Sequence, residues 1–240
     1  MRSRLIWGAQ LAAVLLCASS LKFYYSNATA DELRWILAPT TALVELLSGR
    51  SFAFESYTGY MSSDHRFVIA VPCAGVNFLI TAFLMLGLRR LWRDRLQGIS
   101  WTFLPMTAAL AYVATLIANT TRICIALEIQ RRSFEIDWLS GNQLHRLEGI
   151  LVYFGFLLLL FMLSERMEAA KPRTALLFPL VIYYATTLGI PLLNGSYRQG
   201  IPFWEHFIFV LVCPLIVAAP FVVIQGLMNV RRLKNAEGVG

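Results

Sequence analysis

Six long apolar runs constrain the fold of this chain more than any other feature of its sequence. A helix rises about 1.5 Å per residue, so roughly 20 apolar residues cross the 30 Å hydrocarbon layer of a bilayer. The runs cover approximately residues 5–25, 67–91, 99–124, 147–163, 174–193 and 201–228. The sequence therefore predicts an all-α fold, a polytopic membrane helical bundle of about six transmembrane helices.

The composition agrees with a membrane protein and argues against a nucleic-acid partner. Hydrophobic residues make up 58% of the 240 positions, and charged residues only 15%. The net charge of +7 comes from short basic clusters between apolar runs, which is the pattern that membrane topology produces. Bound membrane lipid is therefore expected, and nucleic acid is not. The first run could instead be a signal peptide after Arg2 and Arg4, but no clean small-x-small cleavage site follows it, so we favour a retained span.

The basic residues between the runs predict the orientation, because positive charge resists translocation. In a six-span arrangement the clusters all fall on one side, which is then cytoplasmic, with both termini inside. The outer segments are residues 26–66, about 125–146, and 194–200. The clusters are Arg2, Arg4, Arg89, Arg90, Arg93, Arg95, Arg166, Lys171, Arg173, Arg231, Arg232 and Lys234.

We find no internal repeat and no linker, so residues 1–240 are predicted to form a single integral membrane domain. The first outer segment carries the prediction of a small extracytoplasmic cap. Residues 31–49 have apolar residues at helical spacing but contain Pro39, which predicts a broken, amphipathic or partly inserted element. Residues 51–67 alternate aromatic and polar side chains around Gly59, as a short hairpin does.

Cys73 lies near the outer end of the second run, in the stretch PCAGVNF. Pro72 and Gly75 disturb a helix there, and irregular backbone at membrane depth is tolerated only inside protein or along a wet cavity. Asn77 follows four residues later, on the same face of a helix. An isolated membrane cysteine is more often structural than reactive, and Cys17 and Cys213 fit that description.

Arg122 and His145 are predicted on the same outer side. Arg122 closes the third run, one turn after Asn119, where the basic bias of the cytoplasmic side does not explain it. His145 stands at the entrance of the fourth run, with Gly149 four residues later. Each alone has an ordinary explanation, because arginine often reaches the headgroups from a span end and histidine is common at surfaces.

Together the three residues suit nucleophilic catalysis by cysteine. The reactive species is the thiolate, which nearby positive charge favours. Histidine can move a proton at neutral pH, and arginine can hold an oxyanion or a carboxylate with several fixed donors.

The motifs PCAGVNF around Cys73, NTTR ending at Arg122 and HRLEG beginning at His145 resemble the exosortase and archaeosortase family. In that family a cysteine is followed closely by glycine, an asparagine precedes an arginine by three residues, and a histidine precedes a glycine by four. The resemblance covers residues 67–160, and the wording CAGVNF is similar to the exosortase K subgroup.

The resemblance implies a membrane-embedded cysteine protease or transpeptidase of the bacterial inner (plasma) membrane, with its active site facing the periplasm. The three histidines lie in distant segments and no HExxH or paired-cysteine spacing occurs, so no metal is expected, and no other cofactor is predicted. Its substrates would be exported proteins with a hydrophobic C-terminal sorting tail of the tripartite PEP-CTERM kind. By matching positions, Cys73 is the nucleophile, Arg122 the oxyanion or substrate-positioning group, and His145 the general base and acid. Gly75, Asn77, Asn119 and Gly149 are expected to support them.

Three alternatives remain open at this stage. A disulfide between Cys73 and Cys124 would make both cysteines structural. Glu205 and His206, near the outer end of the last run, could tune the site or supply another base. A nonenzymatic transporter, or a scaffold for envelope or exopolysaccharide assembly, would use the same spans without catalysis.

Overall fold

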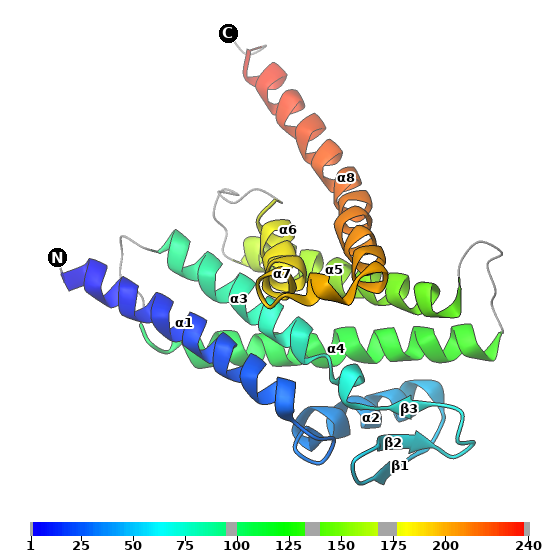
Figure 1. Ribbon diagram of the computed structural model, residues 1–240. Coiled ribbons are helices and arrows are strands. Elements are labelled where there is room, and N and C mark those ends of the chain that lie inside the picture. Colours follow the sequence, from blue (N-terminus) through cyan, green and yellow to red (C-terminus); the bar gives the residue numbers. More distant parts are fainter. Residues whose placement is uncertain (1, 95–99, 133–139, 168–176, 238–240) are drawn as a thin grey trace. The chain divides into compact units, whose positions relative to one another are not determined.

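The computed structural model describes residues 2–94, 100–132, 140–167 and 177–237 (Figure 1). Almost all of the ordered elements are helices. In chain order they are α1 (Arg2–Asn27), α2 (Arg34–Ser48), β1 (Phe52–Glu55), β2 (Gly59–Ser62), β3 (Val68–Ile69), the 3-10 turn η1 (Val71–Ala74), α3 (Val76–Arg93), α4 (Phe103–Arg131), α5 (Gly141–Met167), α6 (Leu177–Tyr184), the π turn η2 (Ala185–Gly189), α7 (Ile190–Leu193), the 3-10 turn η3 (Ser196–Gln199) and α8 (Ile201–Glu237).

The chain divides into two compact units, Met1–Glu148 and Gly149–Gly240. Helix α5 begins in the first unit and continues into the second. Every residue of the predicted cysteine, arginine and histidine set lies in the first unit, which is therefore the one that positions the candidate site. The single domain predicted over residues 1–240 stays a prediction.

Five helices in the described part of the chain are long and apolar enough to cross a membrane. They are Arg4–Asn27, Val71–Arg93, Phe103–Arg131, Gln143–Glu165 and Phe203–Pro220. The predicted helical membrane protein is confirmed at this level. The remaining predicted run corresponds to a shorter apolar helix, Leu177–Leu193, with the π turn inside it. The span count and the orientation stay predictions.

Parts of the sequence predictions fall outside the described residues. These are Arg95, Lys171, Arg173, the first residue of the third run, the first three residues of the fifth, and residues 133–139 of the second outer segment.

Two predicted boundaries were wrong, because hydropathy reports burial rather than conformation. The second run begins at residue 67, but Val68 and Ile69 form strand β3 and α3 starts only at Val76. The third run ends at residue 124, but α4 continues to Arg131. Glu128 contacts Arg131 and Arg132 at spacings of three and four residues, and such pairs support a helix beyond its apolar part.

The predicted hairpin is confirmed, with one strand more than expected. β1 and β2 pair antiparallel in a register that places Phe52 opposite Ser62, and β3 adds to the other edge of β2. The side chains of two acidic residues hold this sheet to the α2 segment. The Asp31 carboxylate accepts the backbone N–H of Tyr57 at 3.0 Å, and the Glu45 carboxylate accepts that of Phe52 at 2.7 Å.

Helix α2 is continuous through Pro39, which corrects the expected break. Proline has no N–H, so the carbonyl of Trp35, four residues earlier, loses its partner within the helix. The Tyr112 hydroxyl of α4 donates a hydrogen bond to that carbonyl at 2.7 Å, and the two rings stack with centroids 5.9 Å apart. A neighbouring helix thus supplies the donor that the proline removes.

Helix α3 packs between α1 and α4 and is the most buried of the candidate spans described (Figure 1). Gly87 lets α1 approach closely, because a Cβ there would lie 3.3 Å from Val14. Hydrogen bonds join α1 to the C-terminal end of α3 and to the turn η1 that precedes α3. The Trp7 indole donates to the Leu91 carbonyl at 3.0 Å, and the Tyr25 hydroxyl faces the Val71 carbonyl at 3.4 Å.

We expect Tyr112→Phe to lower the free energy of unfolding by about 1–3 kcal/mol, since the Trp35 carbonyl is left without its donor while the ring stack remains. Titration with SDS from mild-detergent micelles measures this free energy. Tyr57→Phe is the matched control, because the Tyr57 side chain is 83% exposed. Equal stability of the two variants would show that the Trp35 carbonyl does not need Tyr112.

Candidate functional site

Cys73 lies in the 3-10 turn η1, between strand β3 and helix α3, and not within the helix as the sequence suggested. Pro72 starts this turn, and the Cys73 N–H closes it on the Ala70 carbonyl at 2.8 Å. Gly75 then adopts a left-handed backbone with φ 73° before α3 begins. The cysteine is therefore presented on a short, well-defined connection ahead of a span, with its side chain half-buried.

Gly75 allows this connection to lie directly against α4. A Cβ at Gly75 would be only 3.0 Å from the Asn119 side chain and 3.2 Å from Thr115. The positive φ also disfavours any residue with a Cβ. Both observations give a physical reason for the glycine that follows the cysteine.

Asn119 is fully buried on α4 and holds the Cys73 backbone. Its side-chain amide donates a hydrogen bond of 2.6 Å to the Cys73 carbonyl. The supporting role expected for Asn119 is therefore structural in form, because the amide fixes the main chain of the cysteine. Arg122 follows Asn119 by one turn of α4. The face of α4 that binds the cysteine turn therefore also carries Arg122.

Arg122 contacts His145, as their predicted common side requires. The Arg122 Nη2 lies 2.8 Å from the His145 Nε2. Guanidinium groups only donate hydrogen bonds, so Nε2 must be the unprotonated, accepting nitrogen of a neutral imidazole. The Arg122 side chain is 11% exposed, whereas His145 is 50% exposed.

No hydrogen bond joins the Cys73 sulfur to His145 or Arg122 among the described residues. The cysteine turn and the charged pair are nevertheless both attached to α4, because Asn119, which binds the Cys73 carbonyl, precedes Arg122 by one helical turn. The structure thus brings together Arg122 with His145, and Asn119 with the Cys73 backbone.

Asn77 contacts helix α1, and its supporting role stays a prediction. Its side-chain carbonyl accepts a hydrogen bond from the Lys22 ammonium of α1 at 2.8 Å, and that ammonium also lies 5.5 Å from the centre of the Tyr25 ring. Asn77 therefore joins α3 to α1. Gly149 is buried in α5 at the start of the second unit, and its supporting role stays a prediction.

Glu148 is the residue of this site that the sequence analysis missed. Its carboxylate lies 3.5 Å from the His145 Nδ1 and 3.9 Å from the Arg122 Nε, with only 5% of the side chain exposed. The available signal was its position three residues after His145, which places both on one face of a helix.

The structure also bears on the disulfide alternative for Cys73 and locates Glu205 and His206. All four cysteines are free, so the structure contains no bond between Cys73 and Cys124. In the described part of the chain, no three His, Cys, Asp or Glu side chains gather as a metal site would require. Glu205 and His206 are exposed on α8 in the second unit, and their link to the site stays a prediction.

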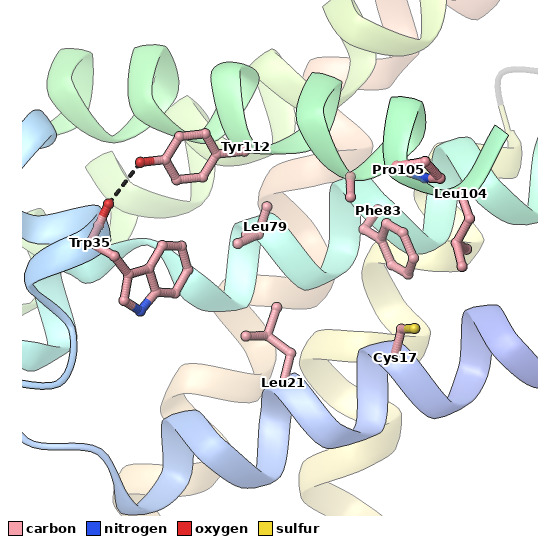
Figure 2. Close-up of a pocket in the computed structure, with 9 residues that line it drawn as sticks. Cys17, Leu21, Trp35, Leu79, Phe83, Leu104, Pro105 and Tyr112 are labelled. Atoms are coloured by element: carbon pink, nitrogen blue, oxygen red, sulfur yellow. Dashed lines mark hydrogen bonds between the residues drawn. The ribbon is translucent and has the colours of Figure 1, made fainter. Parts of the chain in front are cut away.

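A cavity of about 450 Å³ lies elsewhere in the first unit (Figure 2). Helices α1 to α4 line it with Cys17, Leu21, Trp35, Leu79, Phe83, Leu104, Pro105, Ala108 and Tyr112. None of the predicted site residues is among them. The lining is almost entirely apolar, and its polar groups include the Cys17 thiol and the Tyr112 hydroxyl, which donates to the Trp35 carbonyl.

No family model, curated protein or solved structure matches this chain.

We expect Gly75→Ala to lower the free energy of unfolding by about 2–4 kcal/mol, because the added methyl contacts Asn119 and the positive φ becomes strained. The measurement is the same SDS titration. Gly8→Ala serves as the control, since a Cβ at Gly8 meets nothing within 4 Å. If both variants are equally stable, the close approach at Gly75 is unimportant.

Proposed function

We propose that this chain is a membrane-embedded cysteine peptidase or transpeptidase of the exosortase type. It cleaves the C-terminal sorting tails of exported proteins at the outer face of a bacterial inner membrane. The observation that carries the proposal is that α4 contacts both other motifs: Asn119 binds the Cys73 backbone, and Arg122 contacts His145. The 2.8 Å contact of Arg122 with His145 is central, because the two residues lie 23 positions apart and on different helices, so only the fold brings them together.

The reaction begins with removal of the thiol proton. His145 takes the proton of Cys73 on Nε2, and the sulfur attacks the carbonyl carbon of the scissile peptide bond. A carbon–sulfur bond forms, and the carbonyl oxygen becomes an oxyanion. Arg122 donates hydrogen bonds to this oxyanion, which is where fixed donors stabilise acyl transfer most.

The second half releases the tail. The carbon–nitrogen bond breaks, and the imidazolium gives its proton to the departing amine of the membrane-anchored tail. The remaining thioester is attacked by water or by an amine or hydroxyl acceptor, whose proton passes to His145. The thiolate leaves and recovers a proton, so the enzyme returns to its starting state.

Substrate binding must change the partner of Arg122. In the structure the Arg122 guanidinium contacts His145 Nε2, the nitrogen that would accept the thiol proton. A substrate carbonyl that draws Arg122 to itself frees Nε2 for Cys73. Loose catalytic contacts in a substrate-free enzyme often tighten in this way when substrate arrives.

We expect Cys73→Ala and Cys73→Ser to lose processing by roughly a thousandfold or more, because the nucleophile is absent. The probe is an exported fluorescent protein with a PEP-CTERM-like tail, coexpressed with the enzyme and followed by its change in mass. Cys124→Ser, a half-buried cysteine on α4, is the control and should process normally.

Processing at the normal rate by Cys73→Ala would rule out the nucleophile. A thiol-reactive activity probe that fails to distinguish the wild type from Cys73→Ser would favour a transporter or scaffold.

The proposed orientation places the β-sheet outside and the connection from α3 to α4 inside. With the four natural cysteines replaced by serine, we expect a membrane-impermeant maleimide to label Thr58→Cys in intact spheroplasts. Ser100→Cys should react only after permeabilisation. Both positions are exposed, so accessibility within the fold is matched. The reverse pattern of labelling would invert the topology and exclude an outer active site.

A further inference from the structure

Glu148 is an acidic side chain buried near the start of an apolar span, where ionisable residues are rare and usually functional. It lies on α5, one turn after His145 and facing α4. Only 5% of its side chain is exposed, compared with 42% for Glu128 at the end of α4. The burial of a charge at this depth therefore requires a compensating partner.

The carboxylate faces two groups of the site at once. Its Oε2 lies 3.5 Å from His145 Nδ1 and 3.9 Å from Arg122 Nε. Both distances are within the range of an ion pair but longer than a short hydrogen bond. Neither carboxylate oxygen receives a hydrogen bond of normal geometry from the described residues. The oxygens therefore have unused accepting capacity directed at the imidazole and the guanidinium.

The hydrogen-bonding roles of the His145 ring follow from these two neighbours. Arg122 can only donate, so Nε2 accepts. A neutral imidazole carries its one proton on the other nitrogen, so Nδ1–H faces Glu148. A carboxylate can only accept, which makes Glu148 the correct partner for that proton. The two contacts therefore agree on one tautomer.

We infer that Glu148 is a positioning residue of the site, which holds His145 with its proton on Nδ1 and compensates the charge of Arg122. This inference rests on the proposed function and adds a residue to it. When His145 accepts the thiol proton, the carboxylate stabilises the imidazolium without taking part in bond making. When Arg122 turns to the substrate, Glu148 remains to keep the ring oriented.

A purely structural role of Glu148 makes different predictions from a positioning role. Glu148 could act only as the counter-ion that allows Arg122 to be buried, with no influence on the histidine. Loss of the carboxylate would then lower stability and the yield of folded protein. It would leave the tautomer of His145 and the turnover of each folded molecule unchanged.

The test compares Glu148→Gln with Glu128→Gln in the full chain. A glutamine amide can donate as well as accept, so it no longer dictates which ring nitrogen is protonated. Glu128 is the matched control because it contacts arginines on α4 and not His145. The chain has three histidines, so ¹⁵N labelling of the imidazoles gives few signals, and His145→Ala assigns the relevant pair.

We expect wild-type His145 to be protonated on Nδ1. In Glu148→Gln, Arg122 still favours that tautomer by donating to Nε2, so we expect the Nε2-protonated form to appear there in part, beside the Nδ1-protonated form. With the tail reporter, we expect kcat to fall by about a hundredfold or more with KM nearly unchanged, as removing the carboxylate beside a catalytic histidine does. Glu128→Gln should leave both readouts within about twofold of the wild type. If Glu148→Gln does not fold, Glu148→Asp withdraws the carboxylate by one methylene and should give the same changes to a smaller degree.

The inference is overturned if the tautomer and kcat of folded Glu148→Gln match the wild type, whether or not its stability falls. The two proposals can fail separately. A tautomer change in Glu148→Gln combined with normal processing by Cys73→Ala would retain the positioning contact and reject the proposed nucleophile. Loss of processing in Cys73→Ala, with no effect in Glu148→Gln, would retain Cys73 as the nucleophile and reject the positioning role of Glu148.

Discussion

The hydrogen bond from the buried Asn119 amide to the Cys73 carbonyl determines how the first unit is organised around its cysteine. The carbonyl belongs to a non-helical turn at the end of an apolar segment, where an unpaired polar group costs several kcal/mol. Asn119 satisfies it, and Gly75 provides the space that makes the approach possible. Because Arg122 follows Asn119 by one helical turn, the same interaction fixes the depth of the arginine relative to the cysteine.

Charge balance explains why the polar groups of this unit are clustered. A lone arginine or carboxylate within a span is expensive, whereas a guanidinium, a carboxylate and a neutral imidazole in mutual contact compensate one another. Arg122, within α4, forms such a group with His145 and Glu148 near the start of α5. The apolar cavity between α1 and α4 has no comparable group, so the two regions offer different chemistry.

The sequence predicted the helical membrane class, because apolar length is a direct consequence of bilayer thickness. It also predicted the hairpin around Gly59. It placed Arg122 and His145 on a common side, and their side chains lie in contact. It placed Cys73 inside a helix, since hydropathy cannot separate a strand and a 3-10 turn from the span that follows. It also ended α4 too early, because charged residues interrupt the apolar pattern in the last turn, where Glu128 pairs with Arg131 and Arg132.

Other features needed the three-dimensional structure. The partner of Asn77 is Lys22 on α1, which no spacing rule connects to residue 77. Glu148 was hidden by its position inside the HRLEG motif, where a glutamate is also an ordinary helix former. The distance between the cysteine sulfur and the imidazole depends on side-chain conformation, so a motif cannot specify it.

The proline of α2 has a consequence for how that helix is aligned. A regular helix offers no free carbonyl along its middle, so its rotation and sliding against a neighbour depend only on the fit of side chains. Pro39 leaves the Trp35 carbonyl without a partner inside α2, and the Tyr112 hydroxyl of α4 binds it. This hydrogen bond gives α2 one fixed point of contact on α4. An alanine at position 39 would supply the N–H that bonds the Trp35 carbonyl within α2. Helix α2 would then be more stable by itself, but its alignment on α4 would be less strictly fixed.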